Sequence, residues 1–166
     1  MRAASGRNHL TAAKTLTVAT TPFRPKIGPS RWREVDVREY KAEGSAPFRD
    51  VTRQVLFDDP ALASQLRYFE VAPGGHTTLE RHEHAHAVVV HRGGGRCLIG
   101  DRIYDLAEYD LIHVPALTWH QFRAAPDRPL GFLCMVNAVR DRPQLPNADE
   151  LARMRENREI AAFIAL

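Results

Sequence analysis

Acidic and imidazole side chains alternate with other residues in one short stretch of the chain. Its members are Glu80, His82, His84 and His86. Side chains two positions apart on a β-strand point to the same side, so all four would share one face of a regular strand. Imidazole nitrogens and carboxylate oxygens bind divalent first-row metal ions, and a strand leaves them little freedom to lose on binding. The stretch therefore predicts a metal site, with a solvent-facing polar strand as the alternative.

The rest of the chain must supply a framework that holds such a strand. After Ser30, short strand-like runs alternate with Gly, Pro and Asp, which is typical of an all-β sandwich or barrel. The expected strands cover residues 33–40, 51–57, 66–72, 77–91, 96–99, 102–106, 110–114, 120–124 and 130–136. Gly93, Gly94 and Gly95 lie between two of these runs and suit a hairpin that needs positive φ.

The length of the chain indicates a single domain, because 166 residues leave no room for two of ordinary size. Residues 1–30 are rich in Thr, Ala, Pro and Arg with little periodicity, so we expect a basic flexible arm there. The barrel is expected over residues 31–143. Residues 144–166 should form a tail with a short helix over 149–158 and an apolar end packed on the outside of the barrel.

Positive charge is concentrated at the start of the chain. Before Glu34 there are seven Lys and Arg residues and no acid; since the total is +3, the remainder carries 3 minus 7, a net −4. The basic arm lacks interleaved aromatic residues and a polybasic cluster, so nucleic acid is not an expected partner. No apolar run approaches the length of a membrane span or of the core of a secretory signal. We therefore expect a cytoplasmic protein that binds no membrane.

Two segments resemble the two sequence motifs of the cupin family. The run Pro73-Gly74-Gly75, followed by Glu80, His82, His86 and Gly93, resembles the first motif, with the usual first His and the usual Glu exchanged. Residues 110–115, followed by Thr118-Trp119-His120, resemble the second motif. The resemblance implies a jelly-roll β-barrel in which four side chains hold one divalent ion. These ligands would be Glu80, His82, His86 and His120.

The implied ligand set has a definite chemistry. Three neutral imidazoles and one carboxylate leave one or two positions open on a five- or six-coordinate ion, so the site can take part in a reaction. This donor set is compatible with Mn²⁺, Fe²⁺, Co²⁺, Ni²⁺ and Zn²⁺, and ligand type alone does not choose among them. His84 is the candidate acid or base, and Cys97 the candidate thiol at the site. Arg53 and Arg67 are the candidates for holding a phosphate by bidentate contacts.

Over a longer span, which includes residues 130–134 and 140–143, the chain resembles the single-domain bacterial cupins of methylthio-sugar salvage. This resemblance implies a transferase of a sulfur-containing group that uses Mn²⁺. It also implies a phosphosugar substrate, a thiol co-substrate such as glutathione, and a homodimeric assembly. Fold alone does not select a reaction. Two alternatives therefore stay open, an Fe²⁺-dependent cupin dioxygenase and a non-catalytic sugar-binding cupin.

Overall fold

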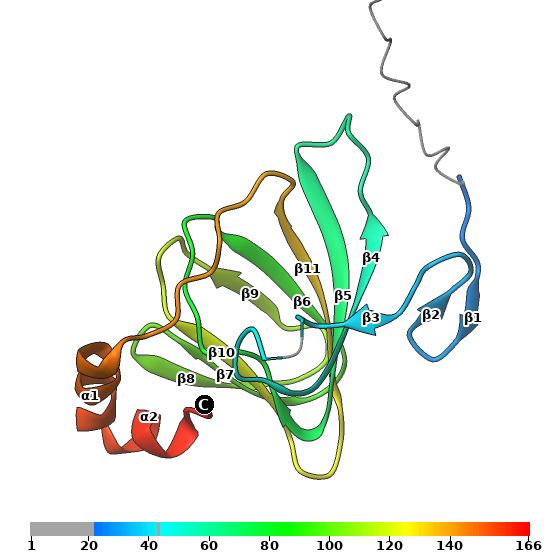
Figure 1. The fold of residues 1–166 in the computed structure, drawn as a ribbon. Helices are drawn as coiled ribbons and strands as arrows, with labels where there is room; N and C mark the ends of the chain where they lie inside the picture. Colours follow the sequence, from blue (N-terminus) through cyan, green and yellow to red (C-terminus); the bar gives the residue numbers. More distant parts are fainter. Residues whose placement is uncertain (1–21, 43) are drawn as a thin grey trace, which may run out of the picture.

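The computed structural model describes residues 22–42 and 44–166. In this part of the chain strands dominate, and helices occur only near the C-terminal end (Figure 1). The strands are β1 (Lys26–Gly28), β2 (Arg31–Trp32), β3 (Arg38–Glu39), β4 (Arg49–Phe57), β5 (Ser64–His76), β6 (His86–Gly93), β7 (Gly95–Ile99), β8 (Arg102–Leu106), β9 (Leu111–Val114), β10 (His120–Ala124) and β11 (Leu130–Asn137). The all-β prediction is confirmed.

Nine strands form one antiparallel sheet that curls into a half-barrel (Figure 1). Its order is β8-β7-β10-β5-β11-β6-β9, with β4 paired to β5 and β3 paired to β4. The long strand β5 connects the two halves of the sheet, because it pairs with β4 and β11 along most of its length and with β10 near its end. Three stacked rings, Phe69, Phe122 and Phe132, lie at the centre of the buried core, with centroid separations of 4.7 and 5.3 Å.

Three local predictions are wrong. Residues 33–40 do not form one strand, because only Arg38 and Glu39 of this stretch pair with a neighbour, as β3. Residues 77–91 do not form one strand, because β6 begins at His86 and Glu80 and Arg81 take part only in isolated bridges. The segment before β6 turns instead, and Leu117 donates its N–H to the carbonyl of His82 at 2.7 Å. The three glycines do not form a hairpin either, because β6 and β7 pair with different strands. Positive φ at Gly93 was predicted correctly: its φ is +71°, and a Cβ there would lie 1.8 Å from a carbonyl oxygen.

The tail forms two helices, α1 (Ala148–Glu156) and α2 (Arg158–Phe163). Asn147 and Glu150 cap α1 reciprocally, as the polar residues at its start favour. Ile160 and Phe163 of α2 pack against Leu79 on the outside of the sheet, as expected for the apolar end of the tail. Neither helix is long and apolar enough to cross a membrane.

The predicted arm is only partly covered, because residues 1–21 lie outside the described residues. Of the remainder, β1 pairs with β2 in a short hairpin at the side of the sheet (Figure 1). Trp32 packs edge-on against Tyr68 of β5 at 5.6 Å, and Ser30 accepts a hydrogen bond from the Tyr68 hydroxyl at 2.9 Å. These contacts hold residues 26–32 against the sheet.

Candidate metal centre

Two segments far apart in sequence place a carboxylate beside an imidazole. Glu80 and His120 form an isolated antiparallel bridge, with N–H···O distances of 3.2 and 3.0 Å in the two directions. Residues directly opposite each other in an antiparallel pair project their side chains on the same side. Both side chains are buried, at 6% and 4% exposure. The bridge therefore fixes the Glu80 carboxylate next to the His120 ring inside the barrel.

The histidine-rich turn before β6 adds the remaining donors. Ligand atoms of Glu80, His82 and His120 lie within 4.8 Å of one another, and so do those of His82, His84 and His86. His82 belongs to both groups, and its ring lies 4.4 Å from that of His86 and 4.9 Å from that of His120. Two donors that share an ion at about 2.1 Å each lie at most about 4.2 Å apart, so small side-chain movements would close either group.

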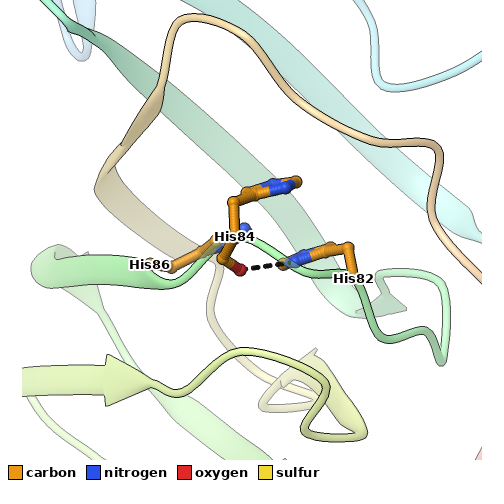
Figure 2. Close-up of side chains that lie close together, drawn as sticks. All are labelled: His82, His84 and His86. Atoms are coloured by element: carbon orange, nitrogen blue, oxygen red, sulfur yellow. Dashed lines mark hydrogen bonds between the residues drawn. The ribbon is translucent and has the colours of Figure 1, made fainter.

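The hydrogen bonds of the histidines leave the metal-binding nitrogens unused. His82 Nδ1 donates to the His84 carbonyl at 2.8 Å, as Figure 2 shows, and His120 Nδ1 donates to the Thr118 carbonyl at 2.9 Å. The Nε2 atoms of His82 and His86 are buried without a hydrogen-bond partner. An orphaned buried nitrogen is costly unless something binds it. The cluster therefore fits a divalent ion.

Burial also keeps the rings in the neutral form that a metal ligand requires. Burial, followed by the charges of neighbouring histidines, lowers the pKa of His86 to about 2. The pKa of His120 falls to about 4 and that of His82 is also lowered, in both cases mainly through burial. Neutral imidazoles offer their lone pairs without first losing a proton.

Glu80 has two partners that the sequence analysis missed. Lys41 forms an ion pair with Glu80 Oε2, and the Tyr40 hydroxyl donates to Oε1 at 3.3 Å. Burial, and then the Glu80 charge, raise the pKa of Tyr40, so its hydroxyl stays protonated. Both partners come from the segment after β3, and they lie at the cavity wall. The carboxylate is thus oriented from both oxygens before any ion binds.

His84, the predicted acid or base, lies beside the other histidines but is held differently. Its ring stacks on that of His82 at 3.8 Å, and its Nδ1 donates to Asp141 Oδ1 at 2.7 Å. The Glu83 backbone N–H donates to the other oxygen of Asp141 at 2.9 Å. These hydrogen bonds lower the pKa of Asp141 to about 2, with the Glu83 N–H as the main cause. Asp141 therefore orients His84 as a charged carboxylate.

The cluster opens into a cavity of about 900 Å³. Both predicted phosphate ligands, Arg53 on β4 and Arg67 on β5, line it. Burial lowers the pKa of Arg67 to about 10, and the charges of Arg140 and Arg53 contribute to that shift. Further arginines of the wall are Arg38, Arg140 and Arg142. One cavity thus combines Glu80, His82, His84 and His86 with five guanidinium groups, while His120 is not among its lining residues.

The two cysteines occupy different places. Cys97, the predicted thiol of the site, is fully buried in the core and is not among the residues that line the cavity. Its assignment to the reaction stays a prediction without support from its position. Cys134 is the cysteine near the cluster, because its Sγ lies 3.4 Å from His86 Nδ1. Its position on β11, between β5 and β6, was not recognisable from the sequence alone.

Neither thiol should react in the native protein. Cys97 and Cys134 are 0% and 1% exposed, and burial raises the pKa of Cys97 to about 12. At pH 8 only roughly one Cys97 in 10⁴ would be a thiolate, the reactive form. Ellman's reagent should therefore detect almost no thiol in the folded protein and two per chain in denaturant. Fast labelling of one thiol in the folded state would contradict this prediction.

An antiparallel half-barrel with a His/Glu cluster inside defines the cupin class, and the chain belongs to the cupin family. Residues 67–136 match the family described as Cupin domain. A curated relative is 1-methylthio-D-xylulose 5-phosphate methylsulfurylase of Rhodospirillum rubrum. It is 56% identical over 143 residues, which cover 86% of this chain and 92% of the relative.

Solved structures agree with this assignment. A cupin 2 conserved barrel domain protein from Rhodopseudomonas palustris is 57% identical, with a TM-score of 0.82 over 86% of this chain and 98% of that one. A cupin-2 domain protein from Rhodospirillum rubrum is 56% identical, with a TM-score of 0.77 over 86% and 95% of the two chains. The polyketide cyclase RemF of Streptomyces resistomycificus shares 20% identity at a TM-score of 0.66, which reflects the fold alone.

Proposed function

We propose that this chain is a metal-dependent methylsulfurylase that removes the methylthio group of 1-methylthio-xylulose 5-phosphate. The group passes to a thiol such as glutathione, and 1-deoxy-xylulose 5-phosphate is formed. The observation that carries the proposal is that Glu80, three histidines of the cluster (His82, His84 and His86) and five arginines line one cavity. The 56% identity to a curated methylsulfurylase supports the choice of substrate.

We assign metal binding to Glu80, His82, His86 and His120, with Mn²⁺ as the expected ion. The buried Nε2 atoms of His82 and His86 support this set, as does the bridge that fixes Glu80 beside His120. A bound divalent ion would supply Lewis acidity, which offsets the negative charge that develops on the ketone oxygen of the substrate. Lys41 and Tyr40 keep the Glu80 carboxylate oriented toward the cluster.

The proposed reaction balances without an external oxidant or reductant. The sulfur of the thiolate bonds to the methylthio sulfur, while the electron pair of the breaking C–S bond stays on the sugar carbon. That carbon then takes up a proton and becomes a methyl group, and the other product is the mixed methyl disulfide. We assign the proton transfer to His84, because Asp141 holds its Nδ1 and leaves Nε2 as the atom that exchanges the proton.

The arginines of the cavity would hold the phosphate of the substrate. Arg53 and Arg67 lie on neighbouring strands, and Arg140 is close enough for its charge to lower the pKa of both. Three like charges at one wall favour a dianionic ligand, and a guanidinium binds a phosphate through two parallel hydrogen bonds. The phosphate would thereby fix the distance between the reacting carbon and the histidines.

An anaerobic assay with the Mn²⁺-loaded protein, glutathione and 1-methylthio-xylulose 5-phosphate tests this function. We expect 1-deoxy-xylulose 5-phosphate and the mixed methyl disulfide in equal amounts by mass spectrometry. Turnover that requires iron and oxygen would favour the dioxygenase alternative. Binding of the phosphosugar without turnover under any metal would favour the non-catalytic alternative, and either result would overturn the proposal.

Replacement of Arg67 by Gln should weaken substrate binding more than it slows the chemical step. A charge-assisted hydrogen bond contributes about 1.5–3 kcal/mol, so KM should rise roughly ten- to a hundredfold with a small change in kcat. Steady-state kinetics measure both constants. Arg102→Gln, at an exposed position on β8, is the matched control and should leave KM unchanged. An unchanged KM in Arg67→Gln would remove Arg67 from the phosphate site.

A further inference from the structure

A second cavity, of about 460 Å³, lies where the turn 125–129 meets the ends of β4, β5, β7 and β10. This turn is the lowest part of the molecule in Figure 1. The second cavity shares no lining residue with the cavity of the metal centre. Its wall carries four arginines and a single acidic side chain, Asp105. The arginines are Arg49, Arg96, Arg123 and Arg128.

Three of these arginines belong to one row that crosses five strands in register. The row runs Arg49, His76, Arg123, Arg96, Asp105, each residue being the cross-strand partner of the next. Directly opposed residues lie on the same face of the sheet, where like charges destabilise the pairing. Arg123 and Arg96 are such a pair, and the charges of Arg96 and Arg49 lower the pKa of Arg123 in addition to burial. The row thus holds three arginines and one carboxylate, Asp105 at its end.

The arginines use few of their donors within the chain. Arg49 donates to the Gly74 carbonyl, and Arg123 donates to the Phe163 carbonyl. The Arg128 Nη1 atom lies 3.9 Å from Oδ2 of Asp127, the preceding residue in the turn. Since a guanidinium carries five N–H donors, each of the three still has several for a ligand. The hydrogen bonds to the carbonyls hold the guanidinium groups of Arg49 and Arg123 in place. Those of Arg96 and Arg123 also lie over the Phe163 ring, each 5.4 Å from its centroid.

Glycine lets one of the arginines lie directly against the backbone. A Cβ on Gly94 would approach the Leu106 carbonyl to 2.8 Å and the Arg128 Nε to 3.1 Å. The side chain of Arg128 therefore lies on the glycine and reaches over the cavity. Gly74 and Gly95 also line the cavity, and neither places a side chain in it.

We propose that this second cavity binds an oxyanion of the phosphate class. The planar fork of a guanidinium matches the oxygens of a phosphate, and several forks around one hollow neutralise a dianion or trianion. A bound anion would also relieve the repulsion between Arg96 and Arg123. The ligand is free inorganic phosphate or pyrophosphate, or the phosphoryl group of a small metabolite. This site is separate from the phosphate position proposed in the metal cavity.

The test must keep the two cavities apart. Full-length Arg53→Gln/Arg67→Gln/Arg140→Gln protein serves as the background, because it lacks the three arginines assigned to the substrate phosphate. Inorganic phosphate and pyrophosphate are titrated by isothermal calorimetry at constant ionic strength set with chloride. We expect binding in this background, and at least tenfold weaker binding when Arg96→Gln and Arg128→Gln are added. Tighter binding of pyrophosphate than of phosphate would indicate a ligand with two linked phosphates. Tighter binding of phosphate would indicate a ligand with a single phosphoryl group.

Arg102→Gln in the same background is the matched control, because it removes one exposed arginine from the neighbouring strand β8. It should leave phosphate binding unchanged. Turnover of the Arg96→Gln/Arg128→Gln protein without the background substitutions should equal that of the parent chain, which verifies folding. Equal phosphate affinity with and without Arg96 and Arg128 would overturn the proposal. A changed oligomer mass at unchanged phosphate affinity would also overturn it and would assign the row to a contact between protein chains.

Discussion

His82→Ala should abolish both metal retention and turnover. His82 belongs to both groups of ligand atoms, and its buried Nε2 has no other partner. Loss of Lewis-acid stabilisation worth several kcal/mol corresponds to a decrease in kcat/KM of about 10³-fold or more. Metal content per chain, measured by plasma mass spectrometry after dialysis, should fall from near one to near zero in the same protein.

His113→Ala is the matched control for His82→Ala. His113 is an exposed imidazole on β9, outside both groups of ligand atoms, so its removal tests only the loss of a histidine. Metal content and kcat/KM should stay at the parental level in this variant. If His82→Ala retained one ion per chain and full turnover, the metal centre would have to lie elsewhere.

His84→Gln should slow the chemical step without removing the ion. A positioned acid or base contributes about 10²–10⁴-fold, and glutamine offers no group that exchanges a proton near neutral pH. We therefore expect kcat to fall within this range while metal content stays near one per chain. The paired measurement is decisive because His84 lies within 4.8 Å of His82 and His86 at its ligand atom. Loss of the ion in His84→Gln would make His84 a ligand and end its assignment as the acid or base.

Asp141→Asn separates the orientation of His84 from its presence. Asparagine keeps the size of the side chain but removes the charged acceptor that His84 Nδ1 contacts at 2.7 Å. An effect of roughly 10–100-fold on kcat is expected, smaller than that of His84→Gln, because the ring itself remains. If Asp141→Asn behaved like the parent chain in kcat and in its pH profile, this carboxylate would serve structure only.

The sequence allowed the fold and the composition of the cluster to be predicted because both depend on local spacing. Alternating runs bounded by Gly and Pro identify strands, and the interval between Glu80 and His86 is short enough to be read directly. The conformation of the interval from Glu80 to His86 was not predicted correctly. A regular strand was expected, but hydrogen bonds from the distant Leu117 and His120 turn the chain before β6 begins.

Residue spacing alone cannot predict contacts between residues that are far apart in the sequence. Asp141 reaches His84 from 57 residues away, and Lys41 reaches Glu80 from 39 residues away. The arginine row likewise exists only because four pairings of strands set Arg96 opposite Arg123 and Arg49 opposite His76. Each of β4, β7 and β10 carries one arginine of the row, and only the register of the sheet brings these three together.

The C-terminal helix α2 supports the metal centre from behind. Adjacent residues of an extended chain point to opposite sides, so Leu79 and Gln121 project outward where Glu80 and His120 project inward. Leu79 packs in one cluster with Phe163, and the Gln121 amide exchanges two hydrogen bonds with the backbone of Ala165, at 2.8 and 3.0 Å. If docking of this tail strengthens metal binding by some free energy, metal binding strengthens the docking by the same amount, because coupling between two equilibria is reciprocal. Docking of the tail on the outer face and binding of an ion on the inner face of one sheet would therefore stabilise each other.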